Sequence, residues 1–145
     1  MAITTAMCTS FKQELLGGIH DLDTDVLKLA LIKQTPTGTY GAATTNYSDV
    51  TGNSDEASGT NYTTGGQALD GATISVDSTT AIVDFTDEVF SNVTVACDGC
   101  IIYNSSKGDK AVCVIDFDGT VSATAGDLTI QFPTADASNA IIRIA

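Results

Sequence analysis

Three of the four cysteines lie between residues 97 and 117, in the stretch CDGCIIYNSSKGDKAVCVIDF. Cys97 and Cys100 form a C-x-x-C pair, and Cys113 lies on the next apolar run. A redox pair of this type needs one thiol at a helix N-terminus, where the helix dipole favours the thiolate. Here the pair opens an apolar run that is typical of a strand, so we expect no such activation.

A zinc site is the other chemistry that these cysteines suggest. A structural zinc ion needs four ligands, and only Cys113 could add a third nearby. Cys8 and the single histidine, His20, are far away in the sequence. We therefore interpret Cys100 and Cys113 as small buried side chains that face one another across a hairpin. They would oxidise in air only if the two thiols lie at disulfide distance.

Acidic residues alternate at two places, Asp21, Asp23 and Asp25, and again Asp116 and Asp118. The spacing resembles a calcium loop, but the glycine and the terminal glutamate of the EF-hand pattern are missing. A hard-cation site built from several loops is one alternative. The other is that the acids cap turns and face solvent.

Catalytic motifs are missing from the sequence. No serine stands in a G-x-S-x-G pattern, and neither glycine pair fits a phosphate-binding loop. His20 has no second histidine to work with, and tryptophan is absent. We therefore predict that the chain is not an enzyme and that it has no catalytic, cofactor-binding or metal-binding residues and no cofactor.

The elements that would position these residues are mostly strands. Short apolar runs recur with Gly, Asn and Asp between them, which is typical of a sandwich, jelly roll or barrel. The predicted strands cover residues 26–33, 72–76, 81–85, 89–96, 100–104, 111–117, 128–132 and 140–144. In the first of these, Leu27, Leu29 and Leu31 would form one strongly buried face.

One helix is predicted, within residues 1–19. Ser10 and Gln13 can form a capping box, or a capping Thr4 or Thr5 would start the helix earlier. Apolar residues recur at helical spacing at Met7, Phe11, Leu15 and Ile19. Residues 34–72 are rich in Thr, Gly, Asn and Ser. We expect this segment to be the most exposed part of the chain, with extended pieces near residues 40, 47–50 and 62–69.

Length and charge limit the function further. The 145 residues fit a single domain, 1–145, and 18 acids against 6 bases give a net charge of -12. Such a surface repels phosphate, so we expect neither nucleic acid nor an anionic membrane as a partner. The start MAITTAMCTSF does not have the basic and apolar regions of a secretory signal, so we expect synthesis in the cytoplasm and reduced thiols.

Three segments carry a resemblance to a known family. They are MAITTAMCTSFKQELLGGIHDL, IIYNSSKGDKAVCVIDF and FPTADASNAIIRIA. Together they resemble small structural proteins of tailed-bacteriophage virions. The resemblance implies a capsid cement or decoration protein with a jelly-roll-like antiparallel β-sandwich, found in the virion after synthesis in the host cytoplasm. It also implies a homo-oligomer whose partners are other virion proteins, the major capsid protein first. The alternative is a tail or fibre-associated protein.

Overall fold

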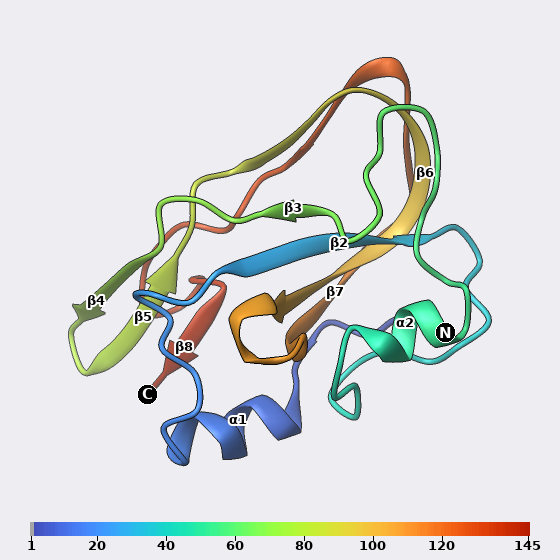
Figure 1. Cartoon of the computed structure of the whole chain (residues 1–145). Coiled ribbons are helices and arrows are strands. Elements are labelled where there is room, and N and C mark those ends of the chain that lie inside the picture. Colours follow the sequence, from blue (N-terminus) through green and yellow to red (C-terminus); the bar gives the residue numbers. More distant parts are fainter. Residues whose placement is uncertain (1) are drawn as a thin grey trace.

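The computed structural model describes residues 2–145, and strands dominate it (Figure 1). The elements in chain order are β1 (Ala6–Met7), α1 (Thr9–Leu16), β2 (Leu27–Lys33), α2 (Ser48–Gly52), β3 (Gln67–Ala68), β4 (Thr73–Asp77), β5 (Thr80–Asp84), β6 (Glu88–Asn104), the 3-10 turn η1 (Ser105–Lys107), β7 (Lys110–Ile130) and β8 (Ile142–Ile144). Among residues 2–145, no helix is long and apolar enough to cross a membrane.

The strands form two antiparallel sheets. The larger sheet has the order β1-β7-β6-β2-β3, and the smaller has the order β4-β5-β8. Each of these strand pairs is antiparallel. The predicted class is confirmed: the chain is mostly β and antiparallel, with an α-helix near its N-terminus. A sandwich or jelly-roll arrangement of the sheets stays a prediction.

The centre of the fold is the long ribbon of β6 and β7. Each of these strands joins two strands that the sequence predicted separately, so the expected turns at residues 98–99, 118–119 and 125–126 lie inside strands. The turn residues act there as bulges, because Asp118, Gly119 and Ala125 have positive φ and the register shifts nearby. Bulges bend a strand, and in Figure 1 the ribbon bends back on itself at the top of the view.

The register of this ribbon corrects the predicted cysteine pairing. Cys100 lies opposite Ile115, and Cys113 lies opposite Ile102. Symmetric pairing fails because the hairpin closes with Asn104 opposite Lys110, which would set Cys100 opposite Val114, and the register shift between Ile102 and Tyr103 moves the pairing by one more residue. The two cysteines keep the same face of the sheet, as predicted, but they are not direct cross-strand partners. All four cysteines are free and buried.

β2 is buried on both faces, which corrects the expectation of a single buried face. Leu29 and Leu31 are fully buried, and so are Ala30 and Ile32 on the other side. β2 is a central strand between β6 and β3, and the side chains on both of its faces belong to the hydrophobic core. A strand that is buried on both faces has a continuous run of apolar residues in its sequence instead of an alternating pattern.

The N-terminal helix is shorter than the predicted span of residues 1–19. Its N-cap is Cys8, which makes no side-chain capping bond, and buried Ser10 Oγ has no partner among the described residues. The capping box is therefore a wrong prediction. Residues before the helix are extended instead, because Ala6 and Met7 pair with β7. The end was predicted correctly, since α1 stops at Leu16 before two glycines, the second with φ of 71°.

The segment 34–72 is largely exposed, as its composition suggested, but buried residues anchor it to the core. Tyr40, Val50 and Asp55 are all at least 98% buried. Tyr40 forms a bridge with Ile3, and the expected extended piece at 47–50 is largely the short helix α2. β3 lies within the third expected piece, 62–69. Small polar residues here make turns that return to the core, which composition alone does not distinguish from exposed loops.

Candidate binding surface

The four cysteine thiols are buried in the core and are held in the unreactive form. Burial raises the pKa of Cys97 and of Cys113 to about 12, and it also raises the pKa of Cys100. Cys8 donates to the carbonyl of Gly41 at 3.8 Å, and burial raises its pKa to about 12 as well. Cysteine reacts and binds metal ions as the thiolate, which a raised pKa disfavours. These four side chains are therefore better suited to packing in the core than to catalysis or metal binding.

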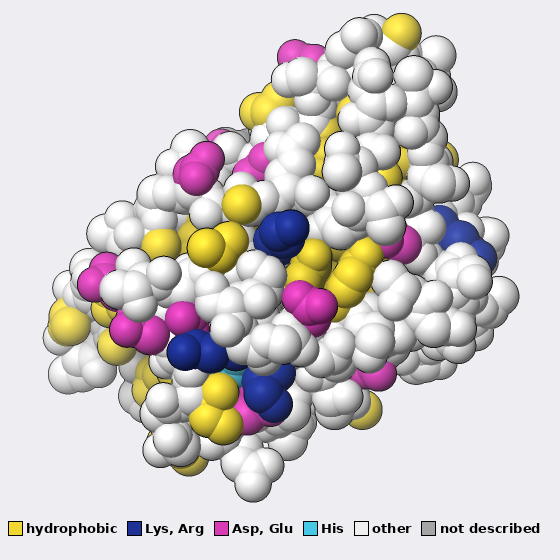
Figure 2. Space-filling view, viewed as in Figure 1, with side chains coloured by type: hydrophobic (Ala, Val, Ile, Leu, Met, Phe, Trp, Pro, Cys, Tyr) yellow, Lys and Arg dark blue, Asp and Glu magenta, His cyan; other side chains and the backbone are white. Residues whose placement is uncertain are grey.

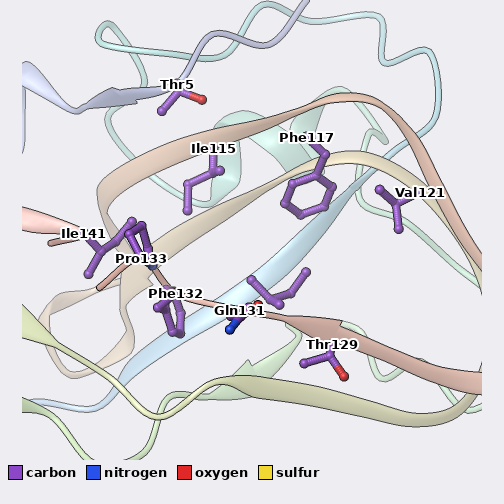
Figure 3. A pocket seen from close by; sticks show the side chains of 10 residues that line it. Thr5, Ile115, Phe117, Val121, Thr129, Gln131, Phe132, Pro133 and Ile141 are labelled. Carbon is purple, nitrogen blue, oxygen red and sulfur yellow. The ribbon is translucent and has the colours of Figure 1, made fainter. Parts of the chain in front are cut away.

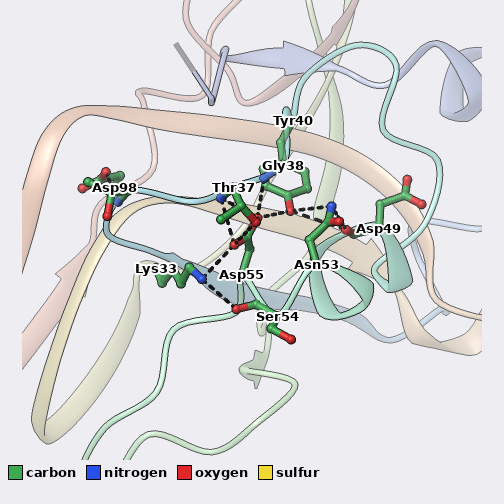
Figure 4. A network of polar contacts seen from close by, with 10 residues as sticks. Lys33, Thr37, Gly38, Tyr40, Asp49, Asn53, Ser54, Asp55 and Asp98 are labelled. Atoms are coloured by element: carbon green, nitrogen blue, oxygen red, sulfur yellow. Dashed lines mark hydrogen bonds and ion pairs between the residues drawn. The ribbon is translucent and has the colours of Figure 1, made fainter.

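The most completely buried carboxylate is Asp55, in a loop that the sequence did not single out (Figure 4). Its oxygens accept hydrogen bonds from the backbone N–H of Thr37 at 3.0 Å and Gly38 at 2.7 Å. Tyr40 donates its hydroxyl at 2.6 Å, and the ammonium of Lys33 lies 2.9 Å away. Burial alone would raise the pKa of Asp55, but these donors outweigh it and lower the pKa. Every oxygen is used internally, so the cluster fixes the 34–55 loop and offers no open position.

A second polar cluster surrounds His20, whose side chain is fully buried. His20 Nε2 lies 2.8 Å from Glu14, and Nδ1 lies 3.0 Å from the Asn104 amide nitrogen. That amide also donates to Asp25 at 2.7 Å, while Lys110 donates to Glu14 at 3.1 Å. Figure 2 shows only a trace of the histidine between basic side chains. The cluster joins α1, the following turn and the tip of the β6–β7 hairpin.

A third cluster lies beside β2, where Glu56 forms a bridge with Ile32. Glu56 accepts hydrogen bonds from the hydroxyls of Tyr47 and Tyr62 and from the N–H of Gly65 at 2.6 Å. Burial first, and then Glu56, raise the pKa of Tyr47. The ring of Tyr47 stacks on Tyr103 with centroids 4.4 Å apart. This cluster is also internally satisfied.

The alternating acids form turns. Asp25 accepts the N–H of Asp21 at 2.9 Å, and Asp116 accepts the N–H of Asp118 at 3.0 Å. The two groups lie on different turns, and within residues 2–145 no three His, Cys, Asp or Glu side chains come together as metal ligands. The turn-capping interpretation therefore describes their geometry. The absence of site residues stays a prediction.

Open apolar surface is found in two other places. The first is a groove of about 400 Å³ beside the bend of β7 (Figure 3). Its walls contain no charged side chain, and they come from both halves of β7, from the segment after it and from the N-terminal strand region: Thr5, Ile115, Phe117, Val121, Thr129, Ile130, Gln131, Phe132, Pro133 and Ile141. Phe117 and Val121 remain partly exposed there.

The second surface is one face of the small sheet. Cross-strand pairing places Val76, Ala81 and Ile144 in one row and Ile74, Val83 and Ile142 in the next. Val83 and Ile142 are covered, whereas Ile74 is 52% exposed, Val76 is 72% exposed and Ile144 is 53% exposed. Figure 2 shows hydrophobic side chains at the surface around β4 and β5, on the left of the view. Contiguous exposed apolar side chains of this kind mark contact sites.

The sequence patterns did not identify either surface. The signal for the small sheet was present, because apolar residues alternate with polar ones in β4 and form a short continuous run in β5. The sequence did not show that the fold covers Val83 and Ile142 and leaves Ile74, Val76 and Ile144 exposed. No protein-family model, curated protein or solved structure matches this chain. The function is therefore argued from the sequence and from these surfaces.

Proposed function

We propose that this chain is a structural component of a tailed-phage virion, a capsid cement or decoration protein that binds the head shell and stabilises it. The observation that carries the proposal is the contrast between its polar clusters and its apolar surfaces. The Asp55, His20 and Glu56 clusters are satisfied within the chain, whereas the β7 groove and the small-sheet row are open. A protein built to bind other proteins has this distribution.

The charge supports the same function. A net charge of -12 disfavours direct contact with packaged DNA and with anionic membranes, so the partners in this proposal are other virion proteins. The chain acts as a non-enzymatic component, is made in the host cytoplasm and is carried in the virion. The proposal includes a homo-oligomeric state, which sedimentation velocity of the purified chain tests.

Particles purified on a density gradient provide the main test. We expect the protein to co-purify with them in a fixed ratio to the major capsid protein, and we expect particles from a deletion strain to lose DNA at a lower temperature. Adding back the purified protein should restore the heat resistance. Absence of the protein from purified particles would refute the proposal.

The alternative is a protein of the tail or of a fibre. The 34–72 segment is the expected contact of that version, and most of its residues are exposed or half-buried, so this surface stays open to a partner. Immunogold labelling of intact particles separates the two: label on the head supports the cement protein, and label confined to the tail supports the alternative.

A further inference from the structure

β7 has a long edge that no other strand covers. On one side it pairs with β6 along its length, from Asn104↔Lys110 to Glu88↔Ile130. On the other side β1 pairs only with Cys113 and Val114, and the hydroxyl of Thr5 accepts the N–H of Asp116 at 2.9 Å. From residue 117 to residue 130, no strand among residues 2–145 pairs with this side. An unpaired edge presents a row of N–H and C=O groups to another strand.

The apolar groove opens beside this edge. Ile115, Phe117 and Val121 come from the half of β7 before the bend, and Ile130 comes from the half after it. Val121 pairs with buried Cys97, so its side chain lies on the inner face of the ribbon, although it is 40% exposed. Figure 3 shows the labelled side chains of the two halves lying on either side of the opening. An added strand could therefore place alternate side chains in the groove.

The charges around the edge indicate whether a second copy of this chain or a strand of another protein binds there. Residues 117–130 contain two aspartates, Asp118 and Asp127, and no Lys, Arg or His. Asp118 is exposed, whereas Asp127 accepts the N–H of Asn92 in β6 at 2.9 Å. A second copy of this chain would bring a further charge of -12 to an acidic edge. Like charges that face one another across an interface disfavour the pairing, whereas basic residues at the ends of an incoming strand favour it.

We propose that the free edge of β7 binds an extended segment of another protein by β-strand addition. The segment alternates apolar and polar residues, places the apolar ones in the groove beside Phe117 and Val121, and carries Lys or Arg near Asp118. Backbone pairing supplies affinity and the groove supplies specificity. The identity of the partner as a shell protein rests on the proposed function, whereas the binding mode does not.

Peptide probes test the binding mode on the full-length protein without phage particles. The probe is a short peptide in which Val and Thr alternate between two Lys at each end. One control peptide has Glu in place of Lys, and another has Pro in the alternating core, which cannot pair along its length. Affinity is measured by fluorescence anisotropy, and protection of β7 amides is measured by hydrogen exchange.

A matched pair of variants tests the location. Val121→Glu places a charge in the groove, and Val89→Glu makes the same change at a residue with the same 40% exposure that does not line the groove. We expect Val121→Glu to weaken Lys-peptide binding about tenfold or more, because the groove offers the carboxylate no partner, and we expect Val89→Glu to leave the affinity unchanged. Circular dichroism and urea unfolding confirm that both variants fold.

The outcomes separate this inference from the proposed function. Binding of the Lys peptide, with new amide protection limited to residues 117–130, supports strand addition even if the protein is missing from virions. Equal binding of the Glu peptide contradicts the charge argument. No peptide binding, or self-association of the chain that Val121→Glu abolishes, overturns the proposal, although the protein could still be found on the particle.

Discussion

Replacing Asp55 with Asn tests whether the buried carboxylate cluster holds the 34–55 loop to the sheet. The substitution keeps the size of the side chain and removes one charge. The carboxylate accepts from two backbone N–H groups and the hydroxyl of Tyr40, and it pairs with Lys33. An amide has one acceptor oxygen instead of two, so one side of the cluster then faces donors only.

The size of the effect follows from these bonds. A hydrogen bond to a charged group contributes about 1.5–3 kcal/mol, against about 1 kcal/mol for a neutral one, and an unpaired buried donor costs about 1–3 kcal/mol. Weakening three bonds and leaving one donor unpaired lowers the free energy of unfolding by about 4 kcal/mol. With a urea m-value of about 2 kcal/mol/M, the unfolding midpoint should fall by about 2 M.

The effect should also depend on pH. The folded-state pKa of Asp55 is below its ordinary value of 3.8, so its stabilisation is fully present above about pH 4. As the pH falls below that value toward the folded-state pKa, the wild-type protein should lose this contribution and Asp55→Asn should not. The difference between the two proteins therefore shrinks in acid.

Urea unfolding at pH 7, 5 and 3 measures both quantities. Asp23→Asn is the matched control, because it makes the same change of charge at an exposed residue, and we expect it to shift the free energy of unfolding by less than about 0.5 kcal/mol. Equal stability of Asp55→Asn and Asp23→Asn at pH 7 would refute the reasoning. A difference that stayed constant down to pH 3 would refute the assigned role of the charge.

Three further predictions concern other parts of the core. Gly66→Ala should lower the free energy of unfolding by more than about 1 kcal/mol, as measured by urea unfolding. Gly66 has φ of 71°, and a Cβ there would collide with the carbonyl of Leu29. Wild-type stability of this variant would contradict the prediction. The four thiols should resist Ellman's reagent at pH 8 in the folded protein and all react in urea, since burial disfavours each thiolate; fast reaction of any one in the native protein would show an exposed site. His20→Ala should lower the free energy of unfolding by about 2 kcal/mol in the same assay, because it leaves a cavity and removes a partner of Glu14. An unchanged free energy of unfolding would mean that the cluster does not hold the hairpin tip to α1.

The polar clusters show the limit of sequence patterns. Asp55 stands in a Thr- and Gly-rich stretch with no motif around it, yet its donors come from residues 33–40. His20 is linked through Asn104 to a hairpin more than 80 residues away. Such partners are set by the path of the chain, which local spacing does not contain.

The strands themselves could be predicted, because alternation and β-branching are local properties. All seven strands expected in the second half fall on or next to strands of the structure. The turn residues were located correctly but misinterpreted at 98–99, 118–119 and 125–126. A residue with positive φ can reverse a chain or form a bulge within a strand, and the pairing partner decides which of the two occurs.

Sequence alone therefore determined the antiparallel β class, the end of α1 at its glycines and the burial of Cys100 and Cys113, since each depends on nearby residues. Tertiary structure decided the cysteine register, the burial of both faces of β2 and the folding of residues 34–72 onto the core. It also decided which apolar side chains stay uncovered. An alternating strand shows that one face is apolar, but only the arrangement of the other elements determines whether that face is buried, as at Val83, or left open, as at Val76.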